Sequence, residues 1–201
     1  MIRFISPPFC VCCGLPFQTG EDHFCGDCLQ GRFVFDQARA AVIYAEPVVA
    51  PLLAFKYQGD LSGLEVFASL AHPLLVCPAH LYAHCDLIVP VPLHPRRLRG
   101  RGFNQALLLA QCFFPHYRAR IYPELLARIR HTAPQSGQSG RARRRNLRGA
   151  FMVTTPSAVK GKSILLVDDV LTTGTTVNEC AAVLRTAGAT EIQVFTLART
   201  V

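Results

Sequence analysis

The sequence predicts an α/β fold, a parallel sheet flanked by helices, preceded by a small metal-binding module. Short apolar runs alternate with helix-like segments, the pattern that parallel strands joined by crossover helices produce. Ile164 to Val167 form an uninterrupted apolar run, typical of a strand that is buried on both faces. Two Cys-x-x-Cys pairs precede these segments, so we expect a zinc-ribbon-like module at residues 1–35 and a larger domain at residues 36–201.

Composition and charge narrow the class of protein. Half of the residues are apolar, which is enough for a core and too many for a disordered chain. No apolar run is long enough for a signal peptide or a membrane span, so we expect a cytoplasmic protein without membrane insertion. The net charge of +8 is local, since thirteen arginines but only one acid, Glu124, lie between His94 and Arg148. This segment predicts an anionic partner: pyrophosphate, nucleic acid or both.

Four cysteines near the N-terminus have the spacing of a zinc site. They are Cys10, Cys13, Cys25 and Cys28. Paired thiolates two residues apart turn back onto one tetrahedral ion, and four protein ligands leave no open position, so we expect structural Zn²⁺. Cys12 and His23 are alternative ligands, and a redox-active cysteine pair is the alternative to a metal.

The next part of the chain predicts an apolar run and two helices. The run covers Ala40 to Tyr44, the first helix lies within residues 48–60, and the second covers Leu64 to Val76. Lys56 stands just before a turn at Gly59-Asp60. We interpret it as a helix-end lysine that complements the helix dipole.

A strand, an arginine-rich loop and a helix follow. The strand runs through Asp86 to His94 and ends in prolines, and Asn104 is the expected N-cap of a helix from Ala106 to Cys112. Backbone amides from Gly100 to Gln105 lie beside arginines and suit an anion. A solvated basic turn is the alternative.

A long polar excursion separates two further strands. The strands are expected at Leu125–Arg130 and Ala150–Val153, and residues 131–149 between them are too many for an ordinary turn. We expect a lid that closes on a ligand, with arginines that neutralise a departing anion and exclude water. A disordered basic insertion is the alternative.

Polar groups are most concentrated after the buried strand that begins at Ile164. Asp168 and Asp169 lie at its carboxyl end, where ligands bind in open α/β folds. The turn after them suits a phosphate, because its glycine permits close backbone approach and its amides face the next helix. The turn residues are Thr172, Thr173, Gly174, Thr175 and Thr176. A helix at Val177–Ala187 and a strand at Glu191–Leu197 follow.

Two levels of resemblance build on these motifs. The stretch ILLVDDVLTTGTT resembles the phosphoribosyl pyrophosphate (PRPP) signature of the type I phosphoribosyltransferases, in which the acidic pair binds the ribose hydroxyls and the loop amides hold the 5-phosphate. With the cysteine pairs, FKYQGD, VPVPLHPRRLRGRGFNQA and TAPQSGQSGRARRRNLRGAF, nearly the whole chain resembles the ComF family of competence-associated proteins. The resemblance implies a type I phosphoribosyltransferase fold with an N-terminal zinc ribbon, a hood region at about 36–85 and a core at 86–201.

The same resemblance implies roles for individual residues. The implied pyrophosphate loop comprises Pro92, Leu93, His94, Arg96 and Arg97. The implied lid positions are Gln135, Arg143 and Asn146. Asp168, Asp169 and Arg143 are the implied catalytic residues, which hold the sugar and the leaving pyrophosphate.

Ligands and partners follow from the resemblance as well. It implies a transferase that takes PRPP or a nucleotide, with Mg²⁺ bridging pyrophosphate oxygens and ribose hydroxyls. The implied process is DNA uptake in natural transformation, or nucleotide metabolism, with other DNA-uptake proteins and single-stranded DNA on the Arg96–Arg148 segment as partners. The alternative is a non-enzymatic single-stranded DNA-binding competence factor that uses PRPP only as an effector.

Overall fold

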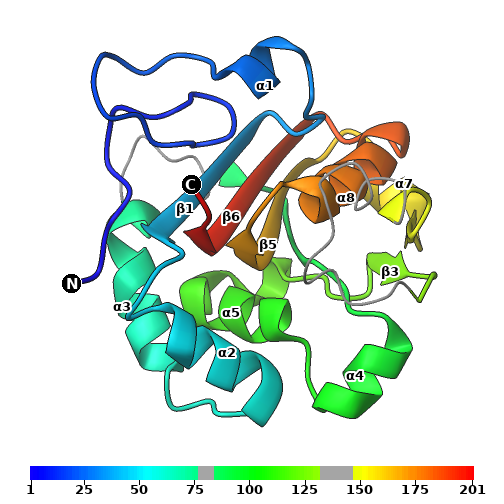
Figure 1. Ribbon diagram of the computed structural model, residues 1–201. Coiled ribbons are helices and arrows are strands. Elements are labelled where there is room, and N and C mark those ends of the chain that lie inside the picture. The colour runs from blue at the N-terminus through cyan, green and yellow to red at the C-terminus, as the bar shows by residue number, and fades with distance from the viewer. Residues whose placement is uncertain (77–83, 132–146) are drawn as a thin grey trace.

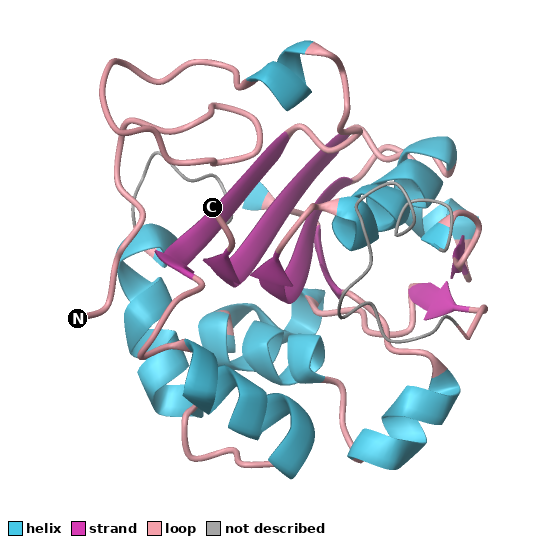
Figure 2. Cartoon of the chain, in the orientation of Figure 1, coloured by secondary structure: helices cyan, strands magenta, loops and turns pink. Residues whose placement is uncertain are grey.

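A four-stranded parallel sheet in the order β1-β6-β5-β2 organises the computed structural model, which describes residues 1–76, 84–131 and 147–201 (Figure 1). Its strands point in the same direction, as a sheet built from crossover connections requires (Figure 2). The elements in chain order are α1 (Gly26–Leu29), β1 (Gln37–Ile43), α2 (Val49–Gln58), α3 (Leu64–Leu75), β2 (Leu87–Pro90), α4 (Pro95–Arg101), α5 (Gln105–Phe113), the 3-10 helix η2 (Pro115–Arg120), β3 (Leu126–Arg128), β4 (Phe151–Val153), α7 (Pro156–Val159), β5 (Ser163–Leu171), α8 (Thr175–Thr186) and β6 (Glu191–Arg199).

Strand β5 lies in the middle of the sheet and is longer than the sequence predicts. Ile164 to Val167 are fully buried, which confirms a strand covered on both faces. Pairing with β6 continues to Leu171, so Asp168 and Asp169 lie inside the strand rather than after it. On the other side β2 ends at Pro90, opposite Val167. The acidic pair therefore lies just beyond the end of one neighbouring strand.

The two faces of the sheet bury two different sets of side chains. Ile164 and Leu166 point into one core, and Leu165 and Val167 into the other, because side chains alternate along a strand. Helices α3 and α5 cover the second face, while α8, the β3–β4 pair and the cysteine segment cover the first (Figure 1). This two-sided cover confirms the predicted fold class.

The N-terminal segment runs along the outer edge of β1. Ile5 donates its N–H to the carbonyl of Ala41 at 3.0 Å, and Ile43 donates to the carbonyl of Arg3 at 2.9 Å. Backbone groups that an edge strand would otherwise expose are thereby paired. The predicted apolar run at 40–44 belongs to this strand, which begins three residues earlier at Gln37.

The remaining predicted elements are present with shifted ends. The strands expected at 125–130 and 150–153 form the antiparallel pair β3–β4. Helix α8 begins at Thr175, two residues before the predicted start. Within the described ranges, none of the helices is both long and apolar enough to cross a membrane.

Candidate functional site

The acidic pair of β5 points to opposite sides of the sheet. Asp169 alternates with Val167 and faces helix α2, where its Oδ1 lies 3.0 Å from Nζ of Lys56. Asp168 faces the other side, and its Oδ1 accepts the backbone N–H of Asp169 at 2.9 Å. Asp169 is 4% exposed, and its Oδ2 is buried without a hydrogen-bond partner in the described part of the chain. A buried acceptor of this kind favours a ligand that donates a hydrogen bond.

The role of Lys56 differs from the sequence interpretation. It does lie in the last turn of α2, where a cation complements the helix dipole, and Gly59 ends the helix in a left-handed conformation. Its ammonium nonetheless reaches across to the sheet and pairs with Asp169. Burial lowers the pKa of Lys56, but the charge and hydrogen bond of Asp169 outweigh burial and raise the pKa. The sequence does not reveal this pair, because 113 positions separate its members.

The carboxyl group of Asp168 is held against ionisation. Burial, followed by the charge of Asp169, raises its pKa from 3.8 to about 7. The backbone N–H of Asp169 and the cations Lys56 and Arg128 act in the opposite direction. Asp168 is therefore partly protonated near neutral pH, and a bound group that donates hydrogen bonds to it would favour its ionised form.

The predicted phosphate turn connects β5 to helix α8. Gly174 has φ of +72°, a left-handed conformation that favours glycine, and is the N-cap of α8. The hydroxyl oxygens of Thr173 and Thr175 lie 2.8 Å apart. The first turn of α8 contains no acidic residue, so no side chain of that turn competes with an anion for its amides.

One pocket of about 340 Å³ brings the acidic pair, the turn and four cations together. The cations are Lys56, Arg97, Arg101 and Arg128. The other lining residues include Tyr44, Tyr57, Pro92, Leu93, Gln105, Asp168, Asp169, Thr172 and Thr176. Four positive against two negative side chains make this pocket suited to a ligand with several negative charges.

Two of these arginines were not singled out by the sequence. Arg101 ends helix α4, lies over the ring of Tyr57 at 5.5 Å and donates to Oε1 of Gln105. Arg128 is part of strand β3, is 7% exposed and lies over the ring of Phe151 at 5.4 Å. The sequence did contain a signal for Arg128, because an arginine is unusual within an otherwise apolar strand.

The implied pyrophosphate loop is only partly a loop. Pro92, Leu93 and Arg97 line the pocket, whereas Arg96 is exposed and is not among its lining residues. From Pro95 the chain forms α4, because proline suits a first helical position and Nδ1 of His94 accepts the N–H of Arg96 at 3.2 Å. The expected strand-loop-helix unit thus contains an additional helix.

The end of this unit agrees with the sequence. Asn104 is the N-cap of α5, and its Oδ1 accepts the N–H of Ala106 at 3.0 Å. Its Nδ2 also donates to the carbonyl of Val91 at 3.2 Å, which ties the helix start to the strand exit. The implied lid residues Gln135, Arg143 and Asn146, Arg143 being also an implied catalytic residue, lie outside the described residues.

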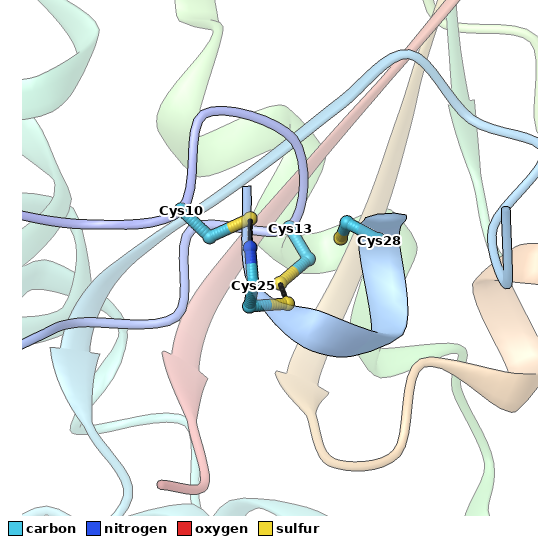
Figure 3. Close-up of side chains that lie close together, drawn as sticks. All are labelled: Cys10, Cys13, Cys25 and Cys28. Carbon is cyan, nitrogen blue, oxygen red and sulfur yellow. Dashed lines mark hydrogen bonds between the residues drawn. The ribbon is translucent and has the colours of Figure 1, made fainter. Parts of the chain in front are cut away.

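The four predicted cysteine ligands lie together and could hold a metal ion such as zinc (Figure 3). Their sulfur atoms all lie within 4.8 Å of one another, and Sγ of Cys13 and Cys25 are 3.6 Å apart. Zinc with sulfur ligands at about 2.3 Å in a tetrahedron places sulfurs about 3.8 Å apart, so the cluster fits. Neither alternative ligand belongs to this group of four: Sγ of Cys12, which interacts with the neighbouring Cys28, donates to the carbonyl of Phe35 at 3.9 Å, and His23 stacks on Phe17.

Comparison with known proteins agrees with this geometry. Residues 113–200 match the family model described as the phosphoribosyl transferase domain. The parallel sheet with its flanking helices and this match together define the class: the protein is phosphoribosyltransferase-like.

Similar proteins identify the family more closely. The chain is 36% identical to competence protein F of Haemophilus influenzae over 96% of this chain and 86% of that protein. It is 37% identical to DNA utilization protein YhgH of Escherichia coli strain K12, over 95% and 84% respectively, and 28% identical to competence protein ComFC of Bacillus subtilis strain 168, over 98% and 80%. The chain belongs to the ComF family, as its motifs predicted.

Proposed function

We propose that this protein binds PRPP or ribose 5-phosphate with Mg²⁺ and serves DNA uptake or nucleotide metabolism as a phosphoribosyltransferase. One observation carries the proposal: a single pocket is lined by Asp169, which has a buried oxygen without a hydrogen-bond partner, by Thr172 and Thr176 of the turn before α8, and by four cations. Carboxylates that accept hydrogen bonds from sugar hydroxyls lie close to amides and cations that bind a phosphate. This combination suits a sugar phosphate better than a nucleobase or a peptide. The competence and DNA utilization names of the relatives support the DNA link.

The donor half of the site is assigned to β5 and the turn. Asp168 and Asp169 accept hydrogen bonds from the two ribose hydroxyls, which supplies the partner that Oδ2 of Asp169 lacks. Amides of the turn from Thr172 to Thr176 donate to the 5-phosphate, and the start of α8 favours its charge. Lys56 keeps Asp169 in place while the sugar binds.

The departing pyrophosphate is assigned to the arginines across the pocket. When the bond from C1 to the pyrophosphate oxygen breaks, its electron pair remains on the pyrophosphate, and negative charge develops there. Arg97, Arg101 and Arg128 line the pocket in which this charge would develop and would stabilise it electrostatically. Mg²⁺ bound with the substrate would neutralise part of the same charge. We propose that Arg143 of the lid also stabilises the departing pyrophosphate.

The acidic pair provides the test of this assignment. Asp168→Asn together with Asp169→Asn removes the two carboxylates but keeps their size, and we expect PRPP affinity to fall at least about 100-fold, since hydrogen bonds to charged groups contribute about 1.5–3 kcal/mol each. Calorimetric titration of PRPP with Mg²⁺ measures the loss, and circular dichroism checks that the variant is folded. Asp86→Asn is the matched control, because this carboxylate accepts the N–H of Ser163 at the opposite end of β5. Unchanged affinity in the double variant would refute the ribose assignment.

Turnover is tested separately from binding. Pyrophosphate release from PRPP, measured against a panel of bases and amines, identifies the acceptor class, and the double aspartate variant controls for background hydrolysis. Release that requires both an acceptor and the aspartates supports a transferase. PRPP binding without release for any acceptor favours the effector role.

A non-enzymatic single-stranded DNA-binding factor is the second candidate. Exposed arginines on α4, on η2 and just after β3 favour it, because they lie on the surface rather than in the pocket. They are Arg96, Arg99, Arg118 and Arg130. Backbone phosphates of a single strand are the natural partners of such a surface.

For the cysteine cluster we propose structural Zn²⁺. The cluster contains four thiols and Cys10 and Cys13 are almost completely buried, so a bound ion would have no open position for a substrate.

A further inference from the structure

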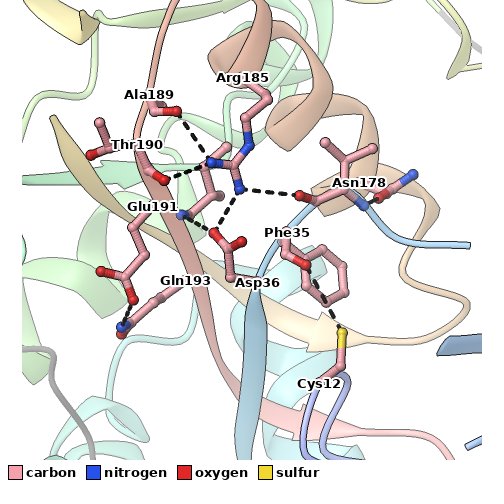
Figure 4. Close-up of polar contacts among 11 residues, drawn as sticks. Cys12, Phe35, Asp36, Asn178, Arg185, Ala189, Thr190, Glu191 and Gln193 are labelled. Atoms are coloured by element: carbon pink, nitrogen blue, oxygen red, sulfur yellow. Dashed lines mark hydrogen bonds and ion pairs between the residues drawn. The ribbon is translucent and has the colours of Figure 1, made fainter. Parts of the chain in front are cut away.

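The segment between the cysteine cluster and β1 is fastened to helix α8, the helix that begins at the candidate phosphate turn (Figure 4). Val34 donates its N–H to Oδ1 of Asn178 at 2.6 Å. Arg185 pairs with Oδ2 of Asp36 at 2.6 Å, and the same oxygen accepts the N–H of Ile192 at 2.7 Å. Residues 34–36 are therefore held against α8, near its beginning at Asn178 and near its end at Arg185, and against β6.

Phe33, the residue just before these contacts, packs directly on the turn. A Cβ atom built on Gly174 would lie 2.8 Å from Cε1 and 3.4 Å from Cζ of the Phe33 ring. The carbonyl of Gly174 also accepts the N–H of Asn178 at 2.9 Å, so the glycine is fixed from the helix side as well. Gly174 is thus required twice, by its positive φ and by the ring that occupies the space of a side chain.

We infer that Phe33 is a positioning residue for the phosphate turn: its ring holds the backbone of Gly174 in the conformation in which the turn amides face a phosphate. The inference rests on the proposed function, because it takes this turn to be the phosphate site. A turn whose amides are held in place before binding loses less conformational entropy when the ligand arrives. Removal of the ring should therefore weaken phosphate binding without unfolding the protein.

The Phe33 ring also connects the turn to the cysteine segment, through Phe35. Phe33 stacks on Phe35 with ring centroids 4.8 Å apart, and Phe35 is 2% exposed. The carbonyl of Phe35 accepts Sγ–H of Cys12, and only four residues separate Phe33 from Cys28 of the cluster. An ion that closes the cluster would fix the start of this short segment.

The test compares two ligands on the zinc-loaded protein. Phe33→Ala should weaken ribose 5-phosphate binding about tenfold, within the range of about 5–150-fold that couplings between sites span. Inorganic pyrophosphate should bind as before, because we assign it to Arg97, Arg101 and Arg128, on α4 and β3. Phe33→Leu, which restores part of the bulk, should recover part of the affinity. Isothermal titration calorimetry supplies both dissociation constants.

A matched control removes another ring from the same module. Phe17→Ala loses a phenylalanine that stacks on His23 and does not touch Gly174, so both ligands should bind with unchanged affinity. Zinc content and Tm of each variant are measured alongside, so that a folding defect is recognised.

Each outcome decides the inference. Equal ribose 5-phosphate affinity in Phe33→Ala and the unaltered protein overturns it and leaves the proposed function intact. Equal weakening of both ligands also overturns it, since the role would then be structural only. An unaltered protein that binds no ribose 5-phosphate overturns the proposed function, and the inference with it.

A double-variant cycle tests the contact itself. Gly174→Ala alone should lose affinity through both strained φ and collision with the ring. In the Phe33→Ala background the collision is absent, so the additional loss from Gly174→Ala should be smaller. Strictly additive losses would contradict a contact between the two residues.

Discussion

Asp168 occupies an electrostatically unfavourable position in the pocket. Burial and the charge of Asp169 disfavour its ionised form, and the nearby cations Lys56 and Arg128 offset this effect only in part. Its folded-state pKa of about 7 lies well above the ordinary value of 3.8. A group whose pKa rises on folding binds a proton more tightly in the folded chain, so folding is favoured when the group is protonated.

Stability should therefore depend on pH through Asp168. As pH rises from about 4 to about 7, the folded protein loses the advantage of holding this proton, and above pH 7 the full cost of the charged group remains. Asp168→Asn removes the charge, so at pH 8 we expect it to raise the free energy of unfolding by about 1–3 kcal/mol, since one pKa unit corresponds to about 1.4 kcal/mol. At pH 4 the difference should vanish. Urea unfolding at both values measures it.

A different pattern would contradict this account. If Asp168→Asn stabilises the protein equally at pH 4 and pH 8, ionisation of Asp168 is not the cause. Asp60→Asn, an exposed carboxylate that bonds Ser62, serves as the control for a surface charge.

Helix α1 is too short to be stable alone, so its structure depends on the rest of the protein. Helix α1 has four residues and no buried side chain, and it follows Cys25 directly. The backbone N–H of Cys25 donates to Sγ of Cys10 at 3.3 Å, which connects the two cysteine pairs. The carbonyl of Cys13 accepts from the buried Arg199 at the end of β6. The cysteine segment is thus held by its own cluster and by the sheet.

Loss of the cluster should therefore affect more than the metal. For Cys10→Ala together with Cys25→Ala we expect no bound zinc and a fall of about 4 kcal/mol or more in the free energy of unfolding, as for other losses of structural metals. Metal analysis of the purified protein and chemical unfolding measure the two effects. Cys12→Ala, which removes a thiol outside the cluster, should retain the metal. Full folding with retained zinc in the double variant would contradict the site.

At the scale of the whole molecule, the arginines of the Arg96–Arg148 segment fall into two groups. Arg97, Arg101 and Arg128 line the pocket, while other arginines of the segment are exposed. The first group suits a small anion enclosed by the protein, and the second suits a long one that passes over the surface. The two candidate functions therefore use different arginines of the same segment.

Salt should separate these two functions. If single-stranded DNA contacts the exposed arginines through about four phosphates, its affinity should fall about 50-fold between 50 and 200 mM salt, because the logarithmic slope is about −0.7 per phosphate. Fluorescence anisotropy of a labelled oligonucleotide measures the slope, and Arg96→Ala with Arg99→Ala should reduce it. PRPP affinity should depend mainly on Mg²⁺ and on Asp168 and Asp169. DNA affinity that does not change with salt would exclude the arginine surface.

Much of the architecture was predictable because it depends on local patterns. The buried strand at Ile164, the N-cap at Asn104 and the cysteine pairs each carry their signal within a few residues. The boundaries were less accurate: β5 continues through the acidic pair, because pairing with β6 rather than hydrophobicity determines where the strand ends. Helix α4 was missed, because its cap uses the side chain of His94.

The sequence by itself determined the fold class, the family motifs and the residue types of the two sites. Only the tertiary structure decided which distant side chains meet: Lys56 with Asp169, Arg128 with the pocket, and Phe33 with Gly174. The reason is physical. A strand or a cap is specified by neighbours along the chain, whereas a contact across the sheet is specified by the crossovers and faces that bring separate segments together.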